Sequence, residues 1–118
     1  MYDHIGLKVK DLDASVRFYS AALGPLGHEL CSRDDTGASF GPAKAPALWL
    51  SAAKGSTGPG VHVALRAEDH AAVDRKAGLK AGGRDHGKPG LRTDYSPKYY
   101  AAFLLDPDGN NVEAVCTR

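Results

Sequence analysis

Two histidines and one glutamate stand on segments that the sequence predicts to be strands: His4, His62 and Glu113. Two imidazoles and a carboxylate can hold Mn²⁺, Fe²⁺, Ni²⁺ or Zn²⁺ and leave positions open for a substrate oxygen. Glutamate is uncommon inside strands. Since Val112 and Ala114 make the other face of that strand apolar, a buried Glu113 would need a bonded partner or a cation. The alternative is that both histidines are ordinary core or rim residues, as strand histidines usually are.

The two histidines occupy equivalent places in an internal repeat. A shift of 58 positions, from 4 to 62, superposes six identical residues of the first half on the second: His4, Leu7, Asp11, Ala14, Arg17 and Gly24 on His62, Leu65, Asp69, Ala72, Arg75 and Gly82. Each half begins with a segment of period-two alternation, which predicts a strand with its histidine opposite the apolar face. An aspartate then stands where a helix N-cap is expected.

The remaining elements follow from periodicity and turn residues. A helix is expected from residue 12 until Gly24-Pro25 stops it, and a second helix over about 68–81. Strands are expected around 28–32, 38–41 and 47–52 in the first half, and in 84–88, 99–105 and 111–116 in the second, with a turn at 106–109. The prediction is an α+β fold of two tandem βαβββ modules, about 1–54 and 60–118, in a single domain of 118 residues. A Gly/Pro-rich linker joins the modules.

Composition excludes some functions. Fifteen basic and 14 acidic residues leave a net charge of +1, which argues against non-specific binding to nucleic acid or an anionic membrane. No apolar run approaches the roughly 20 residues of a membrane-spanning helix, and residues 1–4 do not resemble a signal peptide. A cytoplasmic location is therefore expected, with Cys31 and Cys116 as free thiols.

Three segments carry a family resemblance: 3–9 (Asp-His-Ile-Gly-Leu-Lys-Val), 11–19 (Asp-Leu-Asp-Ala-Ser-Val-Arg-Phe-Tyr) and 103–113 (Phe-Leu-Leu-Asp-Pro-Asp-Gly-Asn-Asn-Val-Glu). They resemble the vicinal oxygen chelate superfamily of glyoxalases, fosfomycin-resistance transferases, bleomycin-resistance proteins and extradiol dioxygenases. The resemblance implies paired modules that curl into an open barrel around a divalent metal, commonly in a homodimer. In many members each site draws ligands from both chains.

The family's metal positions lie on the first strand of each module and on the last strand of the second. Here these positions are His4, His62 and Glu113. The predicted last strand of the first module, 47–51, has no carboxylate, which departs from the four-ligand pattern of glyoxalase I. A potassium-holding serine-rich loop like that of the fosfomycin enzymes is also missing from 87–95, and catechol dioxygenases are usually about twice this length. Bleomycin-binding proteins lack the metal positions that this chain keeps.

The segment from 84 to 100 is expected to choose the substrate. Arg92 is a candidate fork for a carboxylate or phosphate, Lys88 adds positive charge, and Tyr99 adds an aromatic wall. Tyr95 is a candidate proton donor, and Trp49 is a second candidate for the pocket wall, although core packing would also account for it. The alternative is a solvated surface loop. This stretch resembles that of an uncharacterised glyoxalase-like subgroup.

The sequence thus predicts a small metal-dependent enzyme with Glu113 also in a catalytic role. The metal would stabilise negative charge on a small, oxygen-rich substrate, in lyase, isomerase, thiol-transferase or dioxygenase chemistry. The alternative function is a dimer that binds an antibiotic or another small molecule without chemistry.

Overall fold

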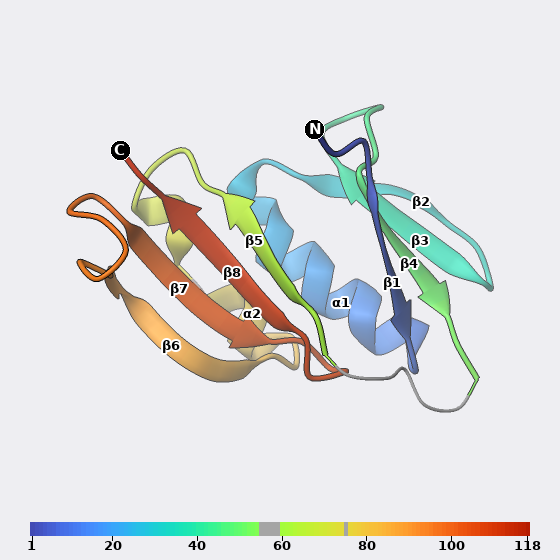
Figure 1. The fold of residues 1–118 in the computed structure, drawn as a ribbon. Helices are drawn as coiled ribbons and strands as arrows, with labels where there is room; N and C mark the ends of the chain where they lie inside the picture. Colours follow the sequence, from blue (N-terminus) through green and yellow to red (C-terminus); the bar gives the residue numbers. More distant parts are fainter. Residues whose placement is uncertain (55–59, 75) are drawn as a thin grey trace.

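The computed structural model describes residues 1–54, 60–74 and 76–118, with the backbone alone at 76 and 77. Two four-stranded mixed sheets, one from each half of the sequence, lie side by side with the helices on one side of them (Figure 1). This is the predicted α+β fold of two βαβββ-like modules. The linker expected at 55–60 lies almost wholly outside the described residues. No helix in the described parts of the chain is long and apolar enough to cross a membrane.

The first module contains β1 (Ile5–Val9), α1 (Leu12–Leu23), η1 (Gly24–Leu26), β2 (Glu29–Arg33), β3 (Gly37–Gly41) and β4 (Leu48–Ala52). Its strand order is β1-β4-β3-β2, with β1 parallel to β4. The predicted cap is confirmed, because the Asp11 side chain accepts a hydrogen bond from the Ala14 N–H at 3.1 Å. Gly27, at φ 84°, ends the short η1 turn.

The second module contains β5 (His62–Arg66), η2 (Ala71–Val73), α2 (Lys76–Lys80), β6 (Arg84–Leu91), β7 (Tyr100–Leu105) and β8 (Asn111–Cys116). The order β5-β8-β7-β6, with β5 parallel to β8, repeats that of the first sheet. The single helix expected over 68–81 is wrong, since two short helices stand in its place. Asp69 still accepts from the Ala72 N–H at 2.9 Å, but the sparse apolar residues there support no long amphipathic helix. β6 is longer than predicted.

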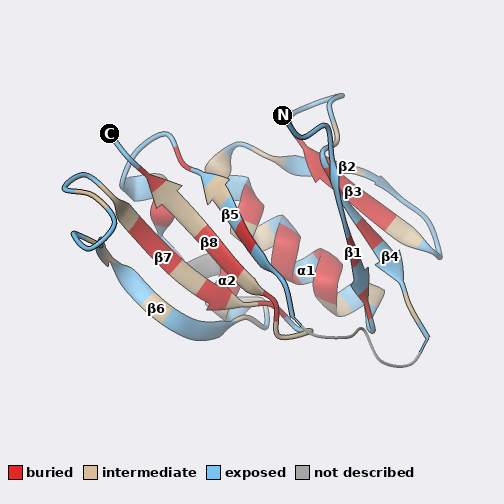
Figure 2. Ribbon diagram, viewed as in Figure 1, coloured by how far each residue is buried: buried red, intermediate tan, exposed pale blue. Residues whose placement is uncertain are grey.

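The core lies between the sheets and α1 (Figure 2). Phe18, Tyr19 and Leu23 present one buried face of α1, as helical spacing predicts. They share one hydrophobic cluster with residues of both sheets, including Phe40 of β3 and Leu104 of β7. The first helix therefore packs against both modules. Cys31 and Cys116 are free, as expected.

A turn of the second module is fastened to this helix. Asp106, at the start of the β7–β8 turn, is fully buried. Its carboxylate accepts hydrogen bonds from the Tyr19 hydroxyl at 2.5 Å, from the Asn110 side chain at 2.9 Å, and from the backbone N–H groups of Asp108 and Asn110. Burial and the negative charge of Asp106 raise the pKa of Tyr19 far above its ordinary value. The two modules are thus joined by a buried polar contact as well as by the apolar core.

Candidate functional site

The outer face of the second sheet, opposite the helices, brings predicted site residues together. Glu113 is the middle position of this cluster, because it pairs with Ala64 of β5 on one side and with Phe103 of β7 on the other. Period-two alternation places His62 and Tyr99 on the same face. The inward-facing residues of these strands join the core, so the fold fixes the direction of each outward side chain.

The Glu113 carboxylate is buried although it lies on the outer face of the second sheet. Its residue is only 3% exposed. One carboxylate oxygen, Oε2, lies 3.0 Å from His62 Nε2, and the other, Oε1, accepts the Tyr99 hydroxyl at 2.5 Å. The His62 side chain is 50% exposed. The arrangement therefore links a buried carboxylate to a solvent-accessible imidazole.

The contact with this carboxylate raises the pKa of Tyr99. Its hydrogen bond to Glu113, its partial burial and the negative charge of Glu113 together raise the pKa of Tyr99 from 10.0 to about 12. The hydroxyl therefore stays protonated at neutral pH and acts as a donor to Oε1. It can orient the carboxylate without neutralising it.

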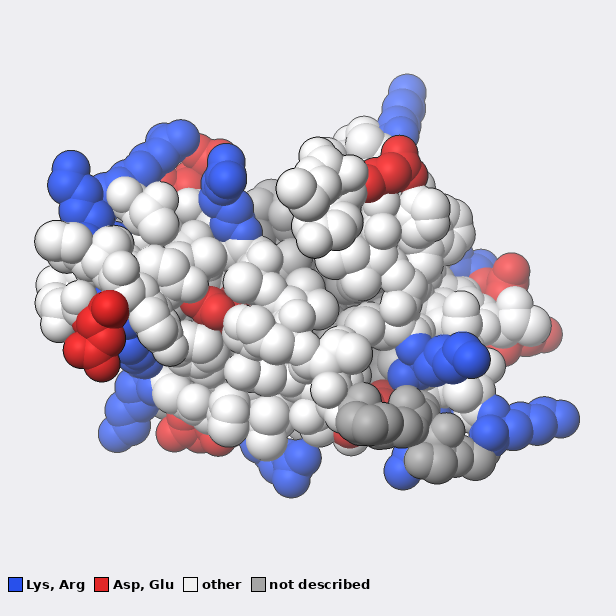
Figure 3. Space-filling view, viewed as in Figure 1, with Lys and Arg blue, Asp and Glu red and all other residues white. Residues whose placement is uncertain are grey.

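An open hollow of about 460 Å³ lies over this cluster. Its lining residues are His62, Tyr95, Tyr99, Phe103, Asn111 and Glu113. Tyr95 is 66% exposed and meets the Tyr99 ring edge-on, at 4.9 Å between ring centroids. Most charged side chains on this face lie toward its rim, and the surface over the central strands is largely uncharged (Figure 3). The hollow thus has aromatic walls and a polar floor.

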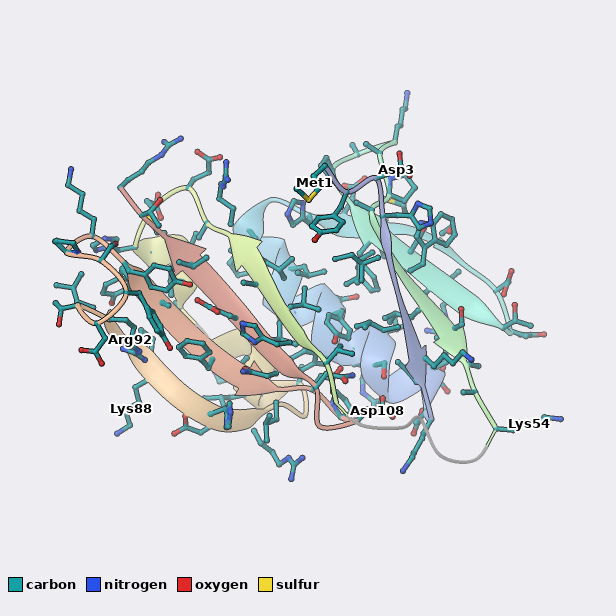
Figure 4. The ribbon with its side chains drawn as sticks, in the orientation of Figure 1. Met1, Asp3, Lys54, Lys88, Arg92 and Asp108 are labelled. Carbon is teal, nitrogen blue, oxygen red and sulfur yellow. The ribbon has the colours of Figure 1, made fainter. Side chains whose placement is uncertain are left out.

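His4 lies elsewhere in the molecule. Its Nδ1 atom is 2.7 Å from the Asp3 carboxylate, and it borders a smaller, largely apolar cavity of about 150 Å³ between the first sheet and β5. Asp3 lies beside the first sheet, whereas Arg92 lies at the outer edge of the second (Figure 4). Within the described ranges, no three His, Cys, Asp or Glu side chains converge as a metal site. The predicted His4–His62–Glu113 set is therefore not assembled within one chain.

The other predicted site residues divide between the two sheets. Arg92 follows β6 and lies over the Phe103 ring, with its Cζ atom 5.5 Å from the ring centroid. Lys88 is exposed on β6, and its carbonyl accepts from the Arg92 guanidinium at 2.5 Å. Trp49, 41% exposed, is on β4 and borders a different hollow beside the β2–β3 turn. The structure therefore places Arg92 against Phe103, which lines the hollow over Glu113, and Trp49 at a separate hollow.

Two lining residues were not singled out by the sequence. Phe103 stacks near His62, with ring centroids 6.4 Å apart, and Asn111 pairs with His62 across β5 and β8. The Asn111 Oδ1 atom is buried and has no hydrogen-bond partner among the described residues. Alternation from Tyr99 along its predicted strand could have placed Phe103 on this face. The parallel pairing that brings Asn111 beside His62 has no local signal.

Comparisons with known proteins agree with this fold. The family described as glyoxalase-like domain matches residues 4–115. A glyoxalase/bleomycin resistance protein from Albidiferax ferrireducens T118 is 26% identical, with a TM-score of 0.81 over 100% of this chain and 99% of that one. A glyoxalase/bleomycin resistance protein/dioxygenase family enzyme from Burkholderia phytofirmans PsJN, 16% identical, shares the fold at a TM-score of 0.71 over 98% of both chains.

A glyoxalase I variant from Zea mays gives a TM-score of 0.74 at 28% identity. It aligns with 97% of this chain, which spans only 45% of the maize chain. The search of curated proteins found no match. The family match extends over both modules and over the strands that carry His62 and Glu113. The chain therefore belongs to the glyoxalase-like domain family and has the vicinal oxygen chelate fold.

Proposed function

We propose that the protein is a divalent-metal-dependent enzyme whose site is centred on Glu113 and His62. The observation that carries the proposal is the burial of Glu113 at the floor of an open hollow, with an accessible imidazole 3.0 Å away. A buried carboxylate is costly unless it is paired or bound to a cation. The partners of Glu113 are the Tyr99 hydroxyl and the His62 imidazole, and no lysine or arginine of the described chain forms an ion pair that would balance its charge. A cation at this floor would meet that need.

The donor atoms fit such a cation in part. Carboxylate oxygen and imidazole nitrogen suit Mn²⁺, Fe²⁺, Ni²⁺ and Zn²⁺, and Asn111 Oδ1 is an unpartnered buried oxygen in the same wall. His62 and Glu113 are only two ligands from one chain, so a three-ligand metal site would still be incomplete. We propose that His4 of a second copy supplies the third, in a homodimer. Tyr2 and Ile5 are exposed and border the same cavity as His4, which gives a second copy an apolar surface to cover beside that histidine.

A bound metal would act as a Lewis acid toward two neighbouring oxygens of a small substrate. The protein's own groups would then have separate tasks. Tyr99 holds the Glu113 carboxylate by its hydroxyl, and Phe103 shields one side of the hollow from water. Tyr95, exposed at the rim, would donate its phenolic proton to a substrate oxygen. The reaction would be of the lyase, isomerase, thiol-transferase or dioxygenase type.

Metal titration of the wild type, Glu113→Gln, His62→Ala and His4→Ala tests the site. Near-stoichiometric binding of one of Mn²⁺, Fe²⁺, Ni²⁺ or Zn²⁺ is expected in the wild type, with a loss of about 100-fold or more in each variant. Glu29→Gln is the matched control, because Glu29 is an exposed carboxylate on β2. Its affinity should equal that of the wild type. No metal binding by the wild type would overturn the proposal and favour the non-catalytic binding dimer.

Mixing two inactive variants tests whether the site is shared. If His4 comes from the second copy, a heterodimer of His4→Ala and Glu113→Gln contains one intact site. An equal mixture, allowed to exchange subunits, should then recover about a quarter of the wild-type metal sites. Light scattering of the wild type should show a dimer. A dimer that recovers no metal on mixing would contradict the shared site.

A further inference from the structure

Arg92 stands beside the candidate site as a positioned cation. Its guanidinium lies 5.5 Å from the centroid of the Phe103 ring, and that ring is 6.4 Å from the His62 ring. Phe103 also lines the hollow over Glu113. The guanidinium, the phenyl ring and the imidazole therefore follow one another along the outer face of the second sheet.

The Arg92 side chain is held in place. One guanidinium nitrogen, Nη2, donates to the Lys88 carbonyl at 2.5 Å, and the Arg92 backbone N–H donates to the Tyr99 carbonyl at 2.6 Å. Contact with an aromatic face further limits the side chain and favours its charge. Arg92 is thus fixed at its backbone, at its tip and along its plane, which lowers the entropic cost of using it to bind a ligand.

Two glycines of β6 leave the room that this arrangement needs. A Cβ atom at Gly90 would lie 3.1 Å from Arg92 Nη1. At Gly87, which has φ 150°, a Cβ would lie 2.9 Å from Phe103 Cδ2 and 3.5 Å from Arg92 Nη2. A side chain at either position would press on the guanidinium or on the ring beneath it. The space that Gly87 and Gly90 leave beside β6 is therefore occupied by the Arg92 guanidinium and the Phe103 ring.

The guanidinium keeps unused donors. Arg92 forms no ion pair with a carboxylate in the described part of the chain, and the Lys88 carbonyl is its one side-chain hydrogen-bond acceptor there. Several N–H groups of the planar fork remain for a ligand. A planar carboxylate can accept two parallel hydrogen bonds from such a fork and lie in the same plane as an attached flat group. Phosphate could also accept them, but it lacks the flat shape that continues along an aromatic wall.

We infer that Arg92 is the anchor for a carboxylate of the substrate, and that the substrate is a small organic acid with an apolar or aryl body. The body would lie against Phe103 and Tyr95, with the carboxylate at the Arg92 fork. The oxygens to be transformed would face His62 and Glu113. This inference rests on the proposed function only in placing the substrate in this hollow, since the carboxylate contact itself needs no metal.

The test compares benzoate with its neutral isostere benzamide as probes on the metal-free protein. Titrations followed by amide chemical shifts should show benzoate binding about tenfold more tightly than benzamide, as a charge-assisted, bidentate contact allows. Arg92→Gln should abolish the preference. Arg92→Lys, which keeps the charge without the planar fork, should lose most of it. Arg84→Gln is the matched control, because it removes the same charge from the other end of β6, and its preference should equal that of the wild type.

Equal binding of the two probes to the wild type would overturn the inference. An equal loss of the benzoate preference in Arg92→Gln and Arg84→Gln would also overturn it, because only the long-range electrostatic field of the protein would then account for the preference. A full benzoate preference in Arg92→Lys would overturn it as well. Metal titration of Arg92→Gln separates the two proposals. Unchanged metal affinity with a lost benzoate preference supports both, whereas benzoate preference in a wild type that binds no metal would overturn the proposed function alone.

Discussion

The outer faces of the two sheets differ in chemistry although their strands are arranged identically. In the first sheet Gly6 of β1 pairs with Trp49 of β4, and in the second Ala64 of β5 pairs with Glu113 of β8. Gly6 and Ala64 are equivalent in the internal repeat, so Trp49 occupies the position of Glu113. A half-exposed indole in one module thus replaces a buried carboxylate in the other.

The neighbouring strand shows the same contrast. Ser39 pairs with Trp49 in the first sheet, where Phe103 pairs with Glu113 in the second. Ser39 shares a 2.6 Å hydrogen bond with Ser32, and neither hydroxyl carries a charge. The repeated backbone fixes where a side chain points, and the residue type alone decides what that position does. Apart from His4, the candidate chemistry is therefore concentrated in the second module.

The connections between the last two strands also differ. In the second module Asp106 receives four hydrogen bonds and reaches Tyr19 of the first module. In the first module the corresponding segment has a backbone hydrogen bond from Ala45 to Pro42. Only the second turn is thereby tied to the other half of the fold, among the contacts that the structure describes.

The largest effect is expected from Asp106→Ala. This change leaves buried donors on Tyr19 and Asn110 without their acceptor, and it should lower the free energy of unfolding by about 3 kcal/mol. Tyr19→Phe removes one of the four hydrogen bonds and should cost about 1 kcal/mol. Urea unfolding measures both. Asp35→Ala, at an exposed position of the first module, should change little, and an equal loss there would show that the tie is not specific.

A smaller effect on stability is expected at alkaline pH, and it should arise on the outer face of the second sheet. The native pKa of Tyr99 is raised to about 12 from 10.0, so the native state keeps a proton that the unfolded chain loses. The contribution of Tyr99 to stability is therefore full below pH 10 and disappears as the pH rises from 10 to 12. The stability difference between the wild type and Tyr99→Phe should shrink over that range. Tyr2→Phe, at an 81% exposed tyrosine, is the control, and a constant difference for Tyr99→Phe would contradict the Glu113 hydrogen bond.

The smallest effect is expected where the modules can be made more alike. Gly6→Ala gives β1 the residue that β5 has at its equivalent position. An added Cβ at Gly6 meets no atom within 4 Å, and the φ angle of Gly6 is not positive. The substitution should raise the free energy of unfolding by about 0.5 kcal/mol, because the unfolded chain loses freedom. Thermal unfolding measures it, and a lower midpoint would show that the first face does not tolerate the second module's residue.

Local patterns in the sequence determined most of the secondary structure. Alternation predicted β1 and β5, the turn residues at 106–109 marked β7 and β8 on either side, and the cap at Asp11 with the stop at Gly24-Pro25 predicted α1 almost to the residue. Such signals depend on neighbours along the chain, so one sequence is enough to see them. The helix expected over 68–81 was wrong because its apolar signal was weak, and β6 ran past its predicted end because Gly87 and Gly90 concealed a strand.

The candidate site needed the tertiary structure. The sequence identified His62 and Glu113 as partners through the repeat and the family resemblance, and the β5–β8 pairing brings them to 3.0 Å. The sequence could not show that His4 lies outside this cluster. The position of His4 depends on how the sheet that contains β1 and the sheet that contains β5 pack around the core that both share with α1. The sequence thus determines which residues face outward on each strand. Only the packing of the sheets decides which of those residues meet, because that packing depends on buried contacts far apart in the chain.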